Sequence, residues 1–343
     1  MSTIEHWISC AYCQGLGKKS QKVSKKKLFR YEATLAQLEM NGNTSEIPKK
    51  PEKSMQRCTV CSGTGLIISD EAPIADIGKY PHVAIVGAGI GGIALALACL
   101  HRQIPFTIFE RDRAFNDRSQ GYGLTLQQAS KELKKFGIQK LEEGVVSTLH
   151  LAHSSNGEIV GNWGLRNLVD KEAVALKNKN KDTNIHIARQ SLRLAFLNQL
   201  GEANFIQWNH QLLDLKVNQK VELTFDVDGI HKQFDADLVV GADGIRSSVR
   251  RLLIDEEVSP LRYLGCIVIL GICKLNALSN LKTELLDGKT VFQTANGTQR
   301  MYMMPFDKDS VMWQFSYPIS EEEARTLSKN GSGALKNEVL KLT

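Results

Sequence analysis

Four of the seven cysteines lie in two close pairs, and thiolates at such a spacing form a ligand set for a metal ion. Cys10/Cys13 and Cys58/Cys61 each begin the pattern C-x-x-C-x-G-x-G. Paired thiolates reach the corners of a tetrahedral Zn²⁺ site, and the glycines permit the tight turns whose amides hydrogen-bond the sulfurs. The two pairs therefore predict one closed, structural zinc site, with a redox dithiol or unligated cysteines as the alternatives.

A second chemical pattern is a glycine turn between an apolar strand and a helix. His82–Val86 predicts the strand, Gly87, Gly89 and Gly92 form G-x-G-x-x-G, and a second apolar strand ends at Glu110. In such a unit the glycines allow the turn, the approach of a pyrophosphate and helix packing, while the acid accepts a bond from a ribose hydroxyl. We predict a dinucleotide site; the alternative is an α/β domain with an incidental glycine turn.

Two charged residues stand where predicted strands end. Asp243 follows an apolar strand, and Arg189 follows another at the start of a predicted helix. A buried acid is costly unless it meets donors, and a cation at a helix N-terminus opposes the helix dipole. We therefore predict functional roles for both, Arg189 beside an anionic neighbour. The alternatives are a structural role for Asp243 and a solvated Arg189.

The elements that position these residues fall into four segments. Residues 1–66 form the cysteine module with its Lys-rich insert, and 67–80 form a linker. Residues 81–255 alternate strands and helices, with inserted strands at about 148–187, and 256–343 form a β-rich region followed by C-terminal helices. The alternation predicts an α/β fold with a doubly wound, Rossmann-like parallel sheet.

The last segment carries its own local signals. Asn296-Gly297 predicts a hairpin turn, and Ser320-x-x-Glu323 a capping box that opens a helix. A second helix is expected over Ala334–Leu342, and the apolar run Leu264–Leu275 is interpreted as a buried strand. The three remaining cysteines lie in apolar runs and are predicted to be small buried residues: Cys99, Cys266 and Cys273.

Composition places the chain among globular proteins. It has 343 residues, 42% hydrophobic and 23% charged, which is enough for about two domains. The net charge of +6 is local, because residues 14–57 hold eleven Lys/Arg and four Glu, and the rest sums to −1. This insert is interpreted as a solvated loop or as a docking surface for protein or RNA, with a short helix over Tyr31–Met40. No apolar run is long enough to span a membrane, and residues 1–10 lack a targeting signal, so a cytoplasmic location is expected.

Taken together, these motifs carry a resemblance. The order of the glycine turn, Glu110, Arg189-x-x-Leu192 and Asp243-Gly-x-x-Ser-x-x-Arg250 resembles the class A FAD-dependent aromatic hydroxylases. Salicylate hydroxylase and the tetracycline-inactivating monooxygenases belong to this family. The similarity spans residues 81 to about 318. The cysteine pairs resemble half of the zinc domain of DnaJ-type chaperones.

The resemblance implies where the cofactor lies. Gly87, Gly89, Gly92 and Glu110 would hold the ADP half of FAD, with Arg111 beside the ribose. Arg189 would lie near the isoalloxazine, and Asp243 near a pyrophosphate groove that also serves NAD(P)H. Within Arg118–Gln127, Gly121 and Gly123 would belong to a turn and strand that run alongside the flavin. The family's second flavin motif, Gly-Asp-Ala-x-His, is absent, which implies that the sequence is truncated after Thr343.

The implied activity is that of a monooxygenase. NAD(P)H would reduce FAD, O₂ would add as a C4a-hydroperoxide, and a small aromatic or polycyclic substrate would be hydroxylated, with no catalytic side chain predicted. Six residues are candidates for the substrate wall, with plain core packing as the alternative: Met301, Tyr302, Met303, Met304, Trp313 and Phe315. The rival functions are another flavoprotein of this fold, a halogenase or a reductase, and a scaffold whose zinc module recruits a partner.

Overall fold

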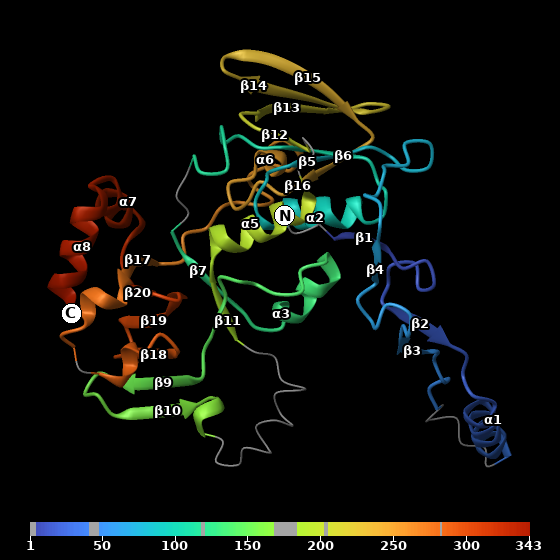
Figure 1. The fold of residues 1–343 in the computed structure, drawn as a ribbon, viewed down its shortest axis with the longest axis horizontal. Helices are drawn as coiled ribbons and strands as arrows, with labels where there is room; N and C mark the ends of the chain where they lie inside the picture. Colours follow the sequence, from blue (N-terminus) through green and yellow to red (C-terminus); the bar gives the residue numbers. More distant parts are fainter. Residues whose placement is uncertain (1–4, 41–47, 118–120, 168–183, 202–204, 282) are drawn as a thin grey trace.

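The computed structural model describes residues 5–40, 48–117, 121–167, 184–201, 205–281 and 283–343. At its centre is a parallel four-stranded sheet in the order β12-β6-β5-β16 (Figure 1). Its strands are β5 (Val83–Val86), β6 (Phe106–Phe109), β12 (Ile206–Gln207) and β16 (Leu238–Gly241). Every residue of β5 is buried, as expected for a strand covered on both faces. The predicted α/β fold is confirmed.

The two faces of this sheet are covered differently. Helices α2 (Ile90–Leu100) and α5 (Arg189–Leu200) pack on one face. An antiparallel meander with α6 covers the other: β13 (Gln211–Val217), β14 (Val221–Val227), β15 (Ile230–Ala236) and α6 (Ser248–Leu253). A doubly wound sheet carries helices on both faces. Here strands take most of the second face, because β14 alternates apolar and polar residues with the period of two that suits a strand.

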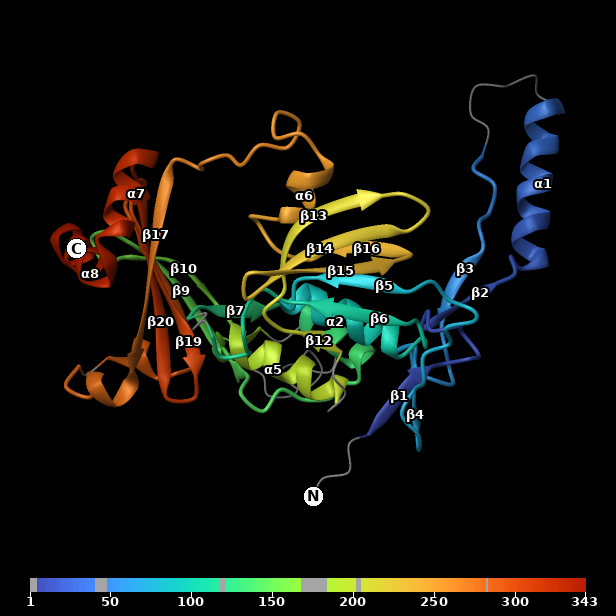
Figure 2. The ribbon, with the colours of Figure 1, turned by 90° about the horizontal axis from the view of Figure 1, so that it is seen from above.

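A second, six-stranded sheet lies beside the first in the order β10-β9-β18-β19-β20-β17 (Figure 2). Its strands are β9 (Leu149–Ser154), β10 (Ile159–Trp163), β17 (Cys266–Lys274), β18 (Thr290–Ala295), β19 (Arg300–Asp307) and β20 (Ser310–Pro318). The inserted strands join this sheet because β9 pairs in parallel with β18. Within the inserted segment, residues 168–183 lie outside the described part of the chain. The predicted turn at Asn296-Gly297 joins β18 to β19.

The edge strand β17 corrects two predictions about burial. Alternate residues of β17 face solvent, with Val268 50% and Ile272 42% exposed, so this strand is covered on one face only. Cys266 is exposed and Cys273 half-exposed, and the prediction that they are buried is wrong. Cys99, within α2, is buried as predicted.

The covered face of β17 packs against the C-terminal helices α7 (Glu321–Lys329) and α8 (Gly331–Leu342). The predicted capping box is present, because Ser320 and Glu323 exchange hydrogen bonds at the start of α7. A small sheet in the order β7-β11-β8 lies between the two large ones: β7 (Gly123–Leu126), β8 (Val145–Val146) and β11 (Ile185–Ala188). The remaining helical turns are short: α3 (Ala129–Glu132), η1 (Leu133–Phe136), η2 (Leu165–Asn167), η3 (Leu275–Leu278) and η4 (Glu284–Leu286).

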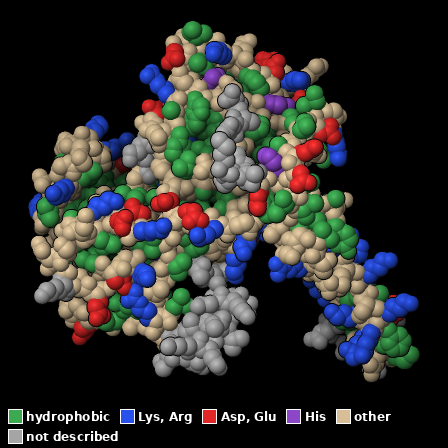
Figure 3. All heavy atoms as spheres, viewed as in Figure 1, with side chains coloured by type: hydrophobic (Ala, Val, Ile, Leu, Met, Phe, Trp, Pro, Cys, Tyr) green, Lys and Arg blue, Asp and Glu red, His purple; other side chains and the backbone are tan. Residues whose placement is uncertain are grey.

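A basic arm, residues 22–53, projects from the N-terminal cysteine module between its two cysteine pairs. Two short antiparallel pairs frame the module: β1 (His6–Ser9) with β4 (Leu66–Ser69), and β2 (Lys18–Gln21) with β3 (Ser54–Arg57). Residues 67–69, placed at the start of the expected linker, therefore belong to a strand. α1 (Lys25–Met40) is longer than the helix predicted over Tyr31–Met40, and it projects from the body with Lys and Arg side chains gathered on the arm (Figure 3). Among the described residues, no helix is long and apolar enough to cross a membrane.

Candidate functional site

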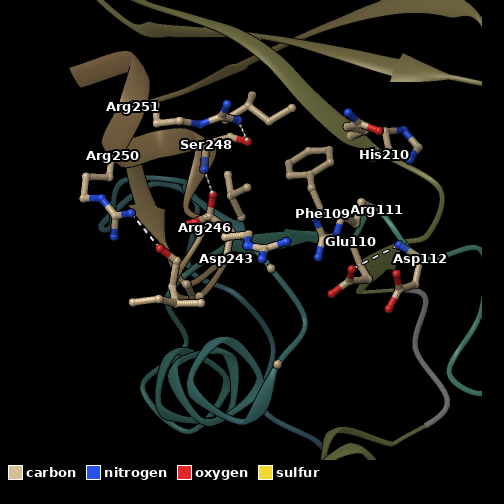
Figure 4. Close-up of a pocket in the computed structure, with 18 of the residues that line it drawn as sticks. Phe109, Glu110, Arg111, Asp112, His210, Asp243, Arg246, Ser248, Arg250 and Arg251 are labelled. Carbon is tan, nitrogen blue, oxygen red and sulfur yellow. Dashed lines mark hydrogen bonds between the residues drawn. The ribbon is translucent and has the colours of Figure 1, made fainter. Parts of the chain in front are cut away.

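A cleft of about 840 Å³ opens at the carboxyl ends of the parallel strands. Because β5, β6 and β16 run in parallel, the residues that follow them meet at one edge. Figure 4 shows Glu110, Arg111 and Asp112 on one side of the cleft and Asp243, Ser248 and Arg250 on the other. The edge beyond the carboxyl ends is where open α/β sheets bind their ligands.

The glycine turn is shaped by close backbone approach. Gly87 has φ +107°, and a Cβ there would lie 2.6 Å from the Ala242 carbonyl oxygen. A Cβ on Gly92 would overlap the carbonyl oxygen of Gly87, so the first turn of α2 requires glycine. Gly89 differs, because a Cβ built there would have the Arg189 side chain as its nearest neighbour, at 3.7 Å. Gly89 also lines the cleft. The turn thus leaves open backbone at the N-terminus of α2, where an anion is favoured.

Glu110 binds the backbone that surrounds the glycine turn. Its side chain is 7% exposed, and its two carboxylate oxygens accept hydrogen bonds from Ala88 N at 2.8 Å and Asp112 N at 3.1 Å. A carboxylate has about four lone-pair sites, so both oxygens retain acceptor capacity toward the cleft. Its role toward a ribose hydroxyl stays a prediction.

Two arginines of α5 reach the same cleft. Arg189 begins the helix, and its guanidinium lies 5.5 Å from the centre of the Tyr122 ring. Its Nη1 is buried without a hydrogen-bond partner among the described residues, and the anionic neighbour of Arg189 stays a prediction. Arg193, one helical turn later, is 1% exposed and donates from Nε to the Ala88 carbonyl at 2.7 Å. Arg193 was not predicted, although its i+4 spacing from Arg189 placed it on the same helix face.

The two carboxylate oxygens of Asp243 have different surroundings. Oδ2 accepts hydrogen bonds from Ser248 N at 2.6 Å and Val249 N at 3.2 Å at the start of α6. Oδ1 is buried and has no partner in the described part of the chain. One oxygen therefore caps α6, as the structural alternative expected, and a functional role for Asp243 stays a prediction.

The cleft is rich in arginine. Arg111 lines it close to Glu110, and Arg246, Arg250 and Arg251 line it near Asp243. Arg118 lies outside the described residues. This distribution of cations suits a ligand that carries phosphates.

Strand alternation separates the candidates for the substrate wall into two groups. Met301, Trp313 and Phe315 pack in the core beneath α7 and α8, away from the parallel sheet. Tyr302 and Met304 face the other way, and a Cβ on Gly123 of β7 would lie 2.9 Å from Met304 Cε. Only this second face adjoins β7. None of the six candidates is among the residues that line the cleft, and Met304 is 2% exposed in a core cluster that Tyr302 packs against, so a substrate wall at these residues stays a prediction.

The four paired cysteines converge on one point. Cys10, Cys13, Cys58 and Cys61 are buried, and their sulfurs lie within 4.8 Å of one another. Gly17 N and Gly65 N each donate to a sulfur at 3.2 Å, on Cys13 and Cys61 respectively. These distances and donors fit a tetrahedral metal site.

The two hydrogen-bonded sulfurs titrate in opposite directions. Burial raises the pKa of Cys13 to about 11 against the hydrogen bond from Gly17. Burial also opposes ionisation of Cys61, but the Gly65 amide and the neighbouring thiols lower the pKa of Cys61 to about 7. The Gly65 amide thus favours the thiolate of Cys61, the form that binds metal.

The part of the chain that forms the cleft is similar to known proteins. A family model described as "FAD binding domain" matches residues 80–330. A FAD-dependent monooxygenase of Trichoderma harzianum is 28% identical over 196 residues, 57% of this chain and 46% of the relative. A chloroplastic zeaxanthin epoxidase of Oryza sativa is 28% identical over 195 residues, 55% of this chain and 28% of the relative. The chain thus spans less than half of either relative.

Solved structures share the fold at low identity. 2,6-Dihydroxypyridine-3-hydroxylase from Arthrobacter nicotinovorans aligns with a TM-score of 0.56 and 16% identity, over 71% of this chain and 57% of that one. The tetracycline destructase Tet(51) aligns with a TM-score of 0.51 and 21% identity, over 71% of this chain and 58% of that one. These alignments concern the fold alone.

Proposed function

Because the chain belongs to the FAD-binding domain family, we propose that its cleft holds FAD for a monooxygenase reaction on a small aromatic or polycyclic substrate. The observation that carries the proposal is a pair of buried polar atoms facing one cleft. Arg189 Nη1 and Asp243 Oδ1 have no partner among the described residues, and the open backbone at Gly89 lies in the same cleft. Buried polar atoms are costly unless they are satisfied, so a polar ligand is expected there.

Each residue of the cleft has a proposed part. The amides of the glycine turn would receive the pyrophosphate, and Glu110 the adenosine ribose, with Arg111 beside it. Arg189 would lie by the riboflavin half and Asp243 by the groove shared with NAD(P)H. Bound FAD would supply the redox chemistry, taking electrons from NAD(P)H and using O₂ to hydroxylate the substrate. The protein's own task is to orient FAD and exclude water.

We propose that the four-cysteine cluster holds a structural Zn²⁺. All four thiols are buried, and two already accept amide hydrogen bonds, which is the environment of a closed site with no open position for chemistry. Metal analysis of the purified chain should give one zinc, lost in Cys58→Ser. A zinc-free wild-type chain would refute this site.

Reconstitution tests the flavin proposal. The purified chain, with FAD added, should acquire the visible absorption bands of bound oxidised flavin, and these should bleach with NADPH or NADH and return with O₂. A colourless chain that rejects FAD would favour the scaffold alternative, and a bound flavin that NAD(P)H does not reduce would favour another flavoprotein of this fold. Docking of the arm to protein or RNA stays a prediction.

A further inference from the structure

Helix α2 connects the cleft to the cysteine module. Its N-terminus carries Gly89 and the glycine turn, and its C-terminal end, 11 residues on, meets the module directly. Ser9 N, adjacent to Cys10, donates to the His101 carbonyl at 2.8 Å. His101 is 2% exposed, so this contact is dry.

Arg102 joins the helix to the turn that follows the first cysteine pair. Its Nη1 donates to Ala98 O at 3.1 Å, within α2, and its Nη2 donates to Gly15 O at 3.3 Å, within the turn. Gly15 has φ +75°, and a Cβ there would lie 3.1 Å from Arg102 Nη2, so the fit is close. One guanidinium therefore spans the two parts.

Two further contacts hold the module in place. Trp7 of β1 is 8% exposed and packs over Gly137, where a Cβ would lie 2.7 Å from the indole. Asp76 N, beyond the module, donates to the Gln103 carbonyl at 2.8 Å. The module is thus attached to the body and not tethered by a loose linker.

The turn that Arg102 contacts depends on the cysteine cluster for its shape. Cys10 and Cys13 bracket its start, and Gln14, between Cys13 and Gly15, has φ +55°, a conformation that a non-glycine residue seldom adopts. A bound metal constrains both turns, whereas four free buried thiols contribute only weak hydrogen bonds.

We propose that Arg102 is a positioning residue that couples metal occupancy of the cysteine cluster to the nucleotide cleft through α2. Metal binding and FAD binding then favour each other, and the coupling is reciprocal. The inference rests on the proposed function, namely metal at the cysteines and FAD in the cleft.

The first test measures FAD affinity by quenching of flavin fluorescence on the full chain, metal-loaded and chelator-treated. We expect FAD to bind about fivefold or more weakly without metal, within the usual range of allosteric coupling. In Arg102→Met this ratio should fall clearly below the wild-type ratio while the chain keeps its metal, with the Ser9–His101 hydrogen bond left in place. Arg325→Met, on the exposed surface of α7, should keep the wild-type ratio. Equal FAD affinity with and without metal in the wild type, or full coupling in Arg102→Met, overturns the inference.

A second measurement separates this inference from the flavin proposal. Hydrogen exchange of the α2 amides is read in metal-loaded and metal-free chains without FAD. Metal removal should reduce α2 protection in the wild type and reduce it much less in Arg102→Met. Metal-independent protection in the wild type overturns the coupling even if FAD binds, whereas failure to bind FAD with metal-dependent protection refutes only the flavin proposal.

Discussion

Glu110 is the residue on which two functions converge. Its carboxylate binds Ala88 N of the glycine turn and Asp112 N, and it retains acceptor sites toward the cleft. The same side chain can therefore shape the turn and receive the ribose.

Replacing Glu110 by Ala removes both interactions at once. We expect FAD affinity to fall by about 1.5–3 kcal/mol, the usual worth of a hydrogen bond to a charged group. Glu142→Ala, which removes an exposed ion pair with Lys140, is the matched control and should bind FAD normally. Titration with FAD measures both. Unchanged affinity in Glu110→Ala would place the nucleotide elsewhere.

Two buried histidines make stability depend on pH. His186 is fully buried and bonded to Thr125 Oγ1 at 3.0 Å, and burial lowers its pKa to about 4. Burial likewise lowers the pKa of His101 to about 4, with Arg102 adding to the shift. Because these folded-state pKa values lie below the unfolded value of about 6.5, unfolding takes up protons. Stability is therefore complete above about pH 6.5 and lost as pH falls toward 4.

His186→Gln isolates one of these contributions. The wild type should lose about 2 kcal/mol more stability than the variant between pH 7 and pH 5, because glutamine cannot take up the proton. Urea unfolding of both chains at the two pH values gives this difference. A stability gap that stays constant with pH would mean that the pKa of His186 is the same in the folded and unfolded states.

At the scale of elements, α2 begins directly after the glycine turn and depends on those glycines for its close packing. Its N-terminus faces the cleft and its buried residues pack on the parallel sheet. Two adjacent glycines in its first turn differ sharply in surroundings. Gly92 lies against the Gly87 carbonyl, whereas Gly91 has nothing within 4 Å of a built Cβ.

Alanine at these two positions should have opposite effects. Gly92→Ala should destabilise the chain by at least about 2 kcal/mol, because backbone must move to admit the methyl. Gly91→Ala should be neutral or stabilise by up to about 1 kcal/mol, the helix-propensity gain. Thermal unfolding compares them. Similar unfolding temperatures would contradict the close approach at Gly92.

At the scale of the molecule, the basic arm is separable from the two sites. No described side chain of α1 is buried, and three lysines crowd its N-terminus, where the helix dipole favours acids. The strands at its base, β2 and β3, pair Gln21 with Ser54. The two ends of the arm therefore lie side by side, at paired residues of neighbouring strands.

Deleting residues 22–53 and joining the strands by Asn-Gly tests this independence. A two-residue turn closes an antiparallel pair. We expect the shortened chain to keep its zinc content and FAD affinity and to lose most of the basic charge. Elemental analysis and FAD titration are the measurements; loss of metal would show that the arm supports the cysteine cluster.

The sequence by itself determined the local chemistry. Spacing within a short segment specifies the cysteine turns, the glycine turn with Glu110, and the capping box of α7, because each depends on backbone geometry over a few residues. It also indicated the α/β class. These are the features that neighbouring residues decide.

Only the tertiary structure decided which faces meet. Alternation along β19 and β20 could not say which face adjoins β7, so substrate wall and core packing both stayed open for Met301, Trp313 and Phe315, and the structure shows core packing for these three. Cys266 lies in an apolar run but on an edge strand, where one face meets solvent. Arg193 and Arg102 act through carbonyl oxygens 105 and 87 residues away. Such partners are set by how sheets and helices pack, which spacing along the chain does not encode.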